Sequence, residues 1–136
     1  MAEKKELDMT AVERDAEDAE RVAEEARREP EPGNYTHTFK KPFKWKGRTF
    51  ESLTFDWEAL TGRDHLEIQH EMTMKGRVLV NAAFDGDFLM GMAARACTER
   101  DEKGKRVIDG QAILEMSMGD FQTITRKARG FLLRAE

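Results

Sequence analysis

The segment HLEIQHE, residues 65–71, carries the side chains of this chain that are best suited to hold a metal ion. Glu67, His70 and Glu71 are three and four residues apart, so one face of a helix could present all three. The spacing is not the H-E-x-x-H pattern of zinc proteases, and His65 lies off that face. A solvated helix face explains the segment more simply, and we expect no metal or other cofactor.

Other residue types that could do chemistry are isolated in the sequence. Asp85 and Asp87 could bind calcium, but no EF-hand series follows them, and they suit the start of a helix better. Cys97 is the single cysteine and lies in an apolar stretch, where a small buried residue is expected rather than a nucleophile. The sequence has no nucleophile-elbow, P-loop or dinucleotide-binding motif. We therefore predict that the protein is not an enzyme.

The segment KPFKWKGRTFESLTF, residues 41–55, mixes aromatic and cationic side chains. Such a mixture could bind single-stranded nucleic acid, with Phe43, Trp45 and Phe50 stacking on bases. It could equally be one covered face of a hairpin, because aromatic residues alternate with polar ones from Tyr35 onward. A two-residue turn at Lys46-Gly47 pairs Trp45 with Arg48 and Phe43 with Phe50, and most lysines then project away from the aromatics. We expect the hairpin and no nucleic-acid partner.

The second strand raises a problem of phase. Leu53 and Phe55 fall on the face opposite to Phe43 and Phe50 if the pairing is regular. Either a bulge near Glu51-Ser52 resets the phase, or the second strand is covered on both sides.

Composition and charge divide the chain into an acidic arm, residues 1–34, and a body, residues 35–136. Residues 1–32 hold 12 acidic and 6 basic side chains, whereas the remainder holds 15 acidic and 17 basic ones. Alanine, glutamate and arginine make residues 10–29 a predicted helix, but its apolar stripe is built of small residues, so we expect a solvated, partly frayed extension or a disordered one. No apolar run is long enough to cross a bilayer, and no signal peptide is evident.

After the hairpin the periodicity becomes helical. A helix is expected to begin at Thr61, with Asp64 three residues on. The most apolar stretch, VLVNAAFDGDFLMGMAARAC at residues 78–97, is expected to be the central helix. Asp109 can cap a further helix, and a last amphipathic helix follows Ser117 or Gly119. The predicted fold is therefore α+β and mainly α: an N-terminal β-hairpin followed by three to four helices.

Six methionines fall between residues 72 and 118 in three pairs with i,i+2 spacing: Met72/Met74, Met90/Met92 and Met116/Met118. The two members of such a pair point about 200° apart on a helix, so one core face cannot easily take both. Some could line an outward apolar surface that accepts varied partners, or they could fill an irregular core. The residues predicted to bind a partner are Phe88, Met90, Met92, Met116, Met118, Phe131, Leu132 and Leu133.

From about Phe39 to Leu133 the chain resembles the phage tail assembly chaperone family. The resemblance rests on four motifs in order: KPFKWKGRTFESLTF, LTGRDHLEIQHE, FLMGMAARAC and ILEMSMGDFQTITRKARGFLL. The last is the most distinctive and is similar to the family's closing signature at Leu114, Met116, Asp120, Phe121, Ile124, Gly130, Phe131 and Leu132. The acidic arm departs from the short N-termini expected of the family.

The resemblance implies a non-enzymatic chaperone in the host bacterial cytoplasm. Such a protein binds the tape measure protein, keeps it soluble, and helps recruit tail tube protein subunits; it is not expected in the mature virion. Self-association is a further expectation, and no membrane partner is expected. Two alternatives remain open, a structural tail completion or neck component and a small nucleic-acid-binding module that uses the 39–50 hairpin.

Overall fold

The computed structural model describes residue 21 and residues 33–135. A β-hairpin is followed by helices, which confirms the predicted α+β, mainly α fold. The predictions for residues 1–32 fall outside the described residues, Arg21 excepted. The elements are β1 (Asn34–Trp45), β2 (Arg48–Asp56), the 3-10 helix η1 (Trp57–Ala59), α2 (Gly62–Met74), the 3-10 helix η2 (Ala82–Phe84), α3 (Gly86–Ala96), α4 (Gly110–Leu114) and α5 (Met118–Ala135).

The hairpin turn and the register beside it are as the sequence predicts. Lys46 and Gly47 both have positive φ, 46° and 76°, which is the backbone of a tight two-residue turn. Trp45 pairs with Arg48 and Phe43 with Phe50. The Phe43 and Trp45 rings lie nearly parallel with centroids 6.4 Å apart, so the aromatic face of the hairpin tip is formed by local pairing.

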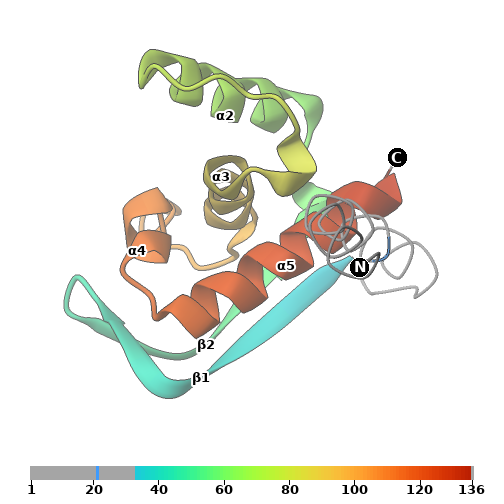
Figure 1. Cartoon of the computed structure of the whole chain (residues 1–136). Helices are drawn as coiled ribbons and strands as arrows, with labels where there is room; N and C mark the ends of the chain where they lie inside the picture. Colours follow the sequence, from blue (N-terminus) through green and yellow to red (C-terminus); the bar gives the residue numbers. More distant parts are fainter. Residues whose placement is uncertain (1–20, 22–32, 136) are drawn as a thin grey trace, which may run out of the picture.

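The phase of the sheet is reset by a bulge in β1, not by extra residues in β2. The regular ladder stops at Thr38, which pairs with Ser52, and resumes at Phe43, so residues 39–42 lie opposite Glu51 alone. Pro42 has no amide hydrogen to donate to a ladder, which explains why the first strand carries the irregularity. The bulge bends the hairpin (Figure 1) and leaves Leu53 opposite His37, facing the helices.

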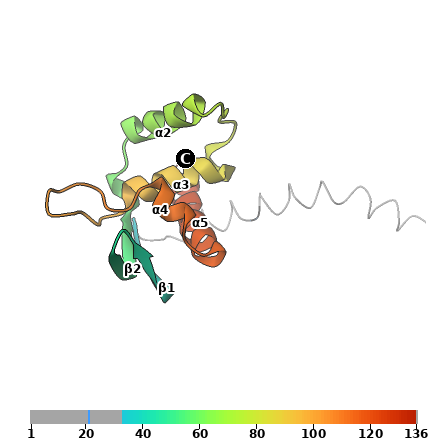
Figure 2. The ribbon, with the colours of Figure 1, turned by 90° about the vertical axis from the view of Figure 1, so that its left-hand side faces the viewer.

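Helix α3 is the centre of the body. It packs against α2, α4, α5 and β2, and six of its eleven residues are buried. Figure 1 shows α3 end-on between α2 and α5, with the hairpin below α5, and Figure 2 shows the same layers from the side. The core also includes Phe55 and Trp57, whose buried rings stack with their centroids 5.5 Å apart.

The predicted helix starts are confirmed by their caps. Asp85 and Asp109 accept hydrogen bonds from the backbone N–H groups of Phe88 and Ala112, at 3.1 and 2.9 Å. The Asp64 carboxylate accepts a hydrogen bond from the Thr61 N–H at 2.8 Å, as in a capping box, at the predicted start of α2. These short polar residues therefore set where α2, α3 and α4 begin.

Helix α2 is the outermost helix and has α3 as its main packing partner. Its buried side chains are Ile68 and Met72 alone. The two helices approach closely at Gly91 of α3, where a Cβ would lie 2.8 Å from Ile68 Cγ2. The lack of a side chain at residue 91 is therefore what lets α2 lie flat on α3.

Candidate functional site

The eight residues predicted to bind a partner do not form one exposed surface. Phe88, Met92, Met116 and Leu133 are buried in the described structure, which is a correction to their placement on an outward surface. Phe131, Leu132 and Met90 are partly buried, and Met118 is exposed. Burial follows from position: Phe88 and Met92 lie on the face of α3 that points into the core.

The methionine pairs within α2 and α3 behave as their helical spacing predicts, with one member turned inward. Met116 lies between α4 and α5, so the helical argument does not apply to the third pair. Met72 is 4% exposed and Met74 is 74% exposed; Met116 is 7% exposed and Met118 is 77% exposed. Met92 is buried and Met90 lies at the surface of a groove. The inward members fill the core, as the alternative interpretation expected, and the outward members remain available to a partner.

An apolar pocket of about 230 Å³ brings together four of the predicted residues. We call it the α2–α5 pocket, because it lies between the start of α2, the middle of α3 and the end of α5. His65 lies at its edge, with its ring 4.8 Å from the ring of Phe88. The apolar residues that line it are Leu60, Ile68, Phe88, Met92, Phe131 and Leu132. Its walls can take one or two apolar side chains from a partner.

A second hollow, of about 550 Å³, lies on the other side of Ile68. We call it the α2–α4 groove. Its walls come from α2 with the residues that follow it and from the start of α4, and its floor comes from α3. Helix α2 thus forms one wall of both hollows. The contacts that fix the position of α2 on α3 therefore determine the shape of the pocket and of the groove.

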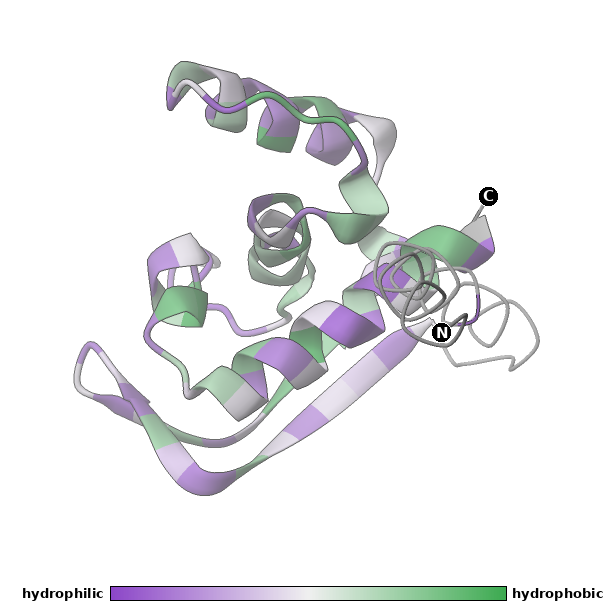
Figure 3. Cartoon of the chain, viewed as in Figure 1, coloured by the Kyte–Doolittle hydropathy of each residue, from purple (hydrophilic) through white to green (hydrophobic). Residues whose placement is uncertain are grey.

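Further apolar side chains are exposed along α2 and the segment after it: Leu66, Met74, Val78 and Val80. Figure 3 shows apolar residues along the connection from α2 to η2, which crosses in front of α2. Met74 is one of the methionines that could face outward, but the exposure of Leu66, Val78 and Val80 was not predicted. The prediction that the central helix includes Val78 and Val80 is wrong, because α3 begins at Gly86. The signal was the short apolar run Val78–Val80, which lies between Gly76 and Asn81 and matches neither a helical nor a strand period.

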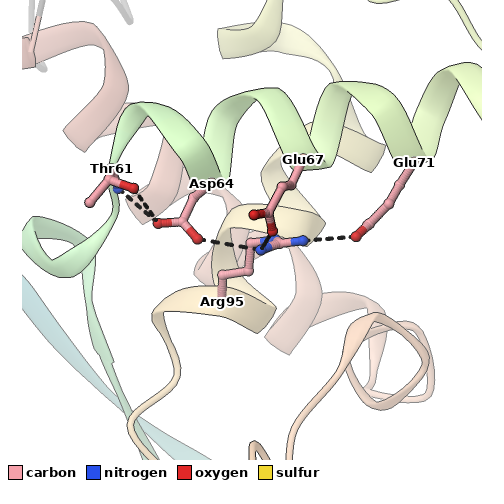
Figure 4. Close-up of polar contacts among 5 residues, drawn as sticks. All are labelled: Thr61, Asp64, Glu67, Glu71 and Arg95. Atoms are coloured by element: carbon pink, nitrogen blue, oxygen red, sulfur yellow. Dashed lines mark hydrogen bonds and ion pairs between the residues drawn. The ribbon is translucent and has the colours of Figure 1, made fainter.

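Arg95 of α3 holds α2 in place by three ion pairs (Figure 4). Its guanidinium lies 3.3 Å from Asp64, 2.7 Å from Glu67 and 2.8 Å from Glu71. Burial opposes ionisation of Asp64, but hydrogen bonds from Thr61 and Arg95 outweigh it and lower the pKa of this carboxyl. Two of the carboxylates considered as metal ligands thus pair with an arginine, and among the described residues no acidic, histidine or cysteine cluster could hold a metal ion.

A second polar cluster ties β1 to the start of α5. The Tyr35 hydroxyl lies 2.8 Å from His37 Nδ1, and His37 Nε2 lies 2.7 Å from Asp120 Oδ1. The Ser117 hydroxyl donates to the other oxygen of Asp120, at 2.8 Å. Asp120 therefore separates the serine from the histidine, so the imidazole cannot take the serine proton as in a hydrolase triad. The cluster links β1 to α5 structurally. Sequence reasoning did not find it, because His37 and Asp120 are 83 positions apart in the chain.

Replacing Asp120 with alanine is expected to lower the free energy of unfolding by about 1–3 kcal/mol, because the buried His37 imidazole and the Ser117 hydroxyl both lose the carboxylate that they contact. Urea unfolding measures the change. Glu115→Ala, which removes an exposed carboxylate two residues before Ser117, should change the free energy by less than about 0.5 kcal/mol. Equal effects of the two substitutions would contradict a stabilising role for the contacts of Asp120 with His37 and Ser117.

Cys97 is buried at the end of α3, as expected, and burial raises the pKa of its thiol. In the described part of the chain, no helix is long and apolar enough to cross a membrane.

Comparison of the chain with protein-family models, with curated proteins and with solved structures finds no match to any of them.

Proposed function

We propose that this chain is a tail assembly chaperone of a bacteriophage, which binds the tape measure protein and keeps it soluble until tail tube subunits assemble around it. The observation that carries the proposal is the α2–α5 pocket, which is lined by apolar side chains of α3 and α5 and by Leu60 and Ile68 beside the polar start of α2, together with exposed apolar residues on α2. The order of the sequence motifs supports the resemblance to the family, and the pocket offers a place where a client side chain could bind.

The pocket fits a helical client better than an extended one. A long apolar helix aggregates because one face of it has no partner in water. One or two side chains from that face can enter the α2–α5 pocket, as anchors do in helix-in-groove complexes, while Leu66 and Met74 offer apolar area on α2 outside it. The charged surface of the remaining body then keeps the complex in solution.

Co-expression with the tape measure protein encoded in the same genome tests the proposal. We expect most of the client to be soluble with this chain and insoluble without it. An equally soluble client in both cases would overturn the chaperone function. Mass spectrometry of purified particles separates the alternative of a tail completion or neck component, because a chaperone is absent from mature particles and a structural component is present.

One observation favours the nucleic-acid alternative enough to test it. Five exposed cations, none of them in an ion pair with a described carboxylate, surround the hairpin tip: Lys40, Lys41, Lys44, Lys46 and Arg48. The mobility shift of single-stranded DNA, titrated with salt, would show a steep loss of affinity if these cations contact phosphates. We expect no specific shift, because Phe43 and Trp45 are half-buried and stack on each other.

A further inference from the structure

The acidic arm leaves the body beside the α2–α5 pocket. The Gly33 carbonyl accepts a hydrogen bond from the Trp57 N–H at 2.9 Å, and the Trp57 carbonyl accepts one from the Leu60 N–H at 3.1 Å. Leu60 lines the pocket, so the two bonds place Gly33 within about 13 Å of its edge. The 12 acidic and 6 basic side chains of residues 1–32 are joined to the body at this point.

The contacts of β1 with α5 lead to the same place. His37 contacts Asp120 near the start of α5, at 2.7 Å. Two residues earlier in β1, the Tyr35 ring lies 5.4 Å from the ammonium of Lys127. The chain before Tyr35 therefore runs toward the end of α5, where Leu132 lines the pocket. Figure 1 shows β1 beginning beside this end of α5.

The described body leaves the pocket partly open. Leu60, Phe131 and Leu132 line it and are only half-buried, so part of their apolar surface is uncovered. Asp64 is the acidic residue that lines it, and its carboxylate already pairs with Arg95. An apolar side chain that enters the pocket therefore meets no unpaired carboxylate among the residues that line it.

Helix α5 carries an excess of positive charge next to the pocket. Its charged residues are Asp120, Arg126, Lys127, Arg129 and Arg134. Arg126 and Arg129 are one turn apart, and neither is in an ion pair with a described carboxylate. Arg129 donates instead to the Ala83 carbonyl at 2.8 Å, and burial, followed by the charge of Arg126, lowers the pKa of its guanidinium. Leu132 of the pocket follows Arg129 by one turn, so the two arginines are available to the carboxylates of an occupant.

One part of the arm offers both the apolar and the acidic side chains. Val22 is the branched apolar residue of the arm that is nearest to the body in the sequence. In the predicted helix, Asp18 and Glu25 lie one turn before and after Val22 on the same side. Residues 18–29 hold five acidic and three basic side chains, an excess opposite in sign to that of α5. The segment around Val22 is thus complementary to the pocket and to the two arginines beside it.

The length of the arm lets Val22 reach the pocket of its own body. Val22 is about 10 Å from Glu29 along the predicted helix, and residues 30–33 add at most about 14 Å. Val22 can therefore lie anywhere up to about 25 Å from Gly33, a range that includes the pocket. Val12 is about 26 Å from Glu29, so it comes as close only if the linker runs straight back along the helix.

We infer that the acidic arm covers the α2–α5 pocket of its own copy, with Val22 between α2 and α5 and its neighbouring carboxylates beside Arg126 and Arg129. The same copy is the occupant because the tether gives the arm an effective concentration of about 1 mM at the pocket, which a second copy must exceed. As a regulation of client binding, the inference rests on the proposed function. The arm covers the apolar walls until a client helix displaces it by burying more apolar area.

NMR spectra of the full chain test where the arm lies. Val22→Asp replaces the apolar side chain with a charge and should weaken docking by about tenfold or more. The backbone amide signals of Thr61 and His65, on the α2 side of the pocket, should then shift, while those of the hairpin tip stay in place. Val12→Asp makes the same change ten residues earlier in the arm and should leave the Thr61 and His65 signals unchanged.

A charge reversal on α5 tests the second contact. Arg126→Glu, at an exposed residue, should shift the Thr61 and His65 signals in the same direction as Val22→Asp, because it repels the carboxylates of the arm. Arg106→Glu makes the same charge change at an exposed residue that does not line the pocket, and it should shift neither signal. Circular dichroism checks that each variant remains folded.

Dilution distinguishes the arm of the same copy from the arm of a second copy. From about 500 to 20 µM the pocket signals should not move, since a tethered arm has the same effective concentration at every dilution. Three results would overturn the inference: signals that move on dilution, Thr61 and His65 signals that Val22→Asp leaves unchanged, or equal shifts from Val22→Asp and Val12→Asp.

Client binding tests the regulatory part of the inference. An arm docked in about nine of ten copies lowers the apparent affinity for the client about tenfold, so Val22→Asp should raise the yield of co-purified tape measure protein by up to about tenfold, and Val12→Asp should not. An unchanged yield with Val22→Asp would overturn regulation by the arm. A client that none of the three proteins keeps soluble would overturn the proposed function, whereas the NMR signals still decide where the arm lies.

Discussion

Replacing Phe88 with alanine is expected to lower the free energy of unfolding by about 3–5 kcal/mol, because the side chain is 1% exposed and its loss leaves a cavity under α2 and α5. A domain of this size is stable by about 5–15 kcal/mol, so the change removes a large part of the total. Urea unfolding followed by circular dichroism gives the value. The buried position of Phe88 in the core cluster is the reason for the size of the effect.

Met118→Ala is the matched control for this prediction. Both residues were predicted from the sequence to bind a partner, but Met118 is exposed and its truncation should change stability by less than about 0.5 kcal/mol. Similar losses from the two substitutions would contradict the placement of Phe88 in the core. Truncating Phe88 is therefore a poor test of client binding, since it destabilises the protein at the same time as it alters the pocket.

Replacing Arg95 with methionine is expected to lower the free energy of unfolding by about 2 kcal/mol at neutral pH. The substitution keeps most of the packing volume but leaves three carboxylates of α2 without their shared cation. Glu67 and Glu71 are substantially exposed and each pair contributes little; Asp64 is mostly buried and contributes more. Arg63→Met, which removes an exposed arginine from the same helix, should cost less than about 0.5 kcal/mol.

The Arg95 effect should depend on pH in a defined direction. The pKa of Asp64 is lower in the folded protein than its usual value of 3.8, so its contribution is complete above that value and is lost as the pH falls through the folded pKa. The difference between the wild type and Arg95→Met should therefore shrink below about pH 4 and remain constant from pH 6 to 8. A difference that does not change down to pH 2 would mean that Arg95 acts by packing alone.

Local features were the most predictable parts of the fold. The turn at Lys46-Gly47, the register of Trp45 beside it, and the caps at Asp85 and Asp109 each depend on residues a few positions apart. The bulge lies near Glu51-Ser52, as predicted, but the extra residues are in β1, because the phase of two strands can be reset from either strand. Pro42 was the residue that indicated β1 as the bulged strand, since a proline without an N–H group interrupts a ladder more readily than Glu51 does.

The candidate site was less predictable because it depends on which side of each helix meets a neighbour. The i,i+2 spacing correctly separated Met72 from Met74 on α2, but could not say which of the two turns inward. Arg95 offered no local signal, because its three partners lie 24 to 31 positions earlier in the chain. The α2–α5 pocket likewise joins residues from Leu60 to Leu132 and exists only after α2 has packed on α3.

The most direct test of the central claim measures how much tape measure protein co-purifies with the wild type and with two variants of α2. His65→Glu places a carboxylate at the edge of the α2–α5 pocket, and Gln69→Glu places one on the same helix away from it; both positions are exposed. We predict that His65→Glu lowers the yield of the complex by about tenfold, the effect of a charge left facing an apolar anchor, while Gln69→Glu leaves the yield unchanged. Equal yields from all three proteins would contradict binding at this pocket.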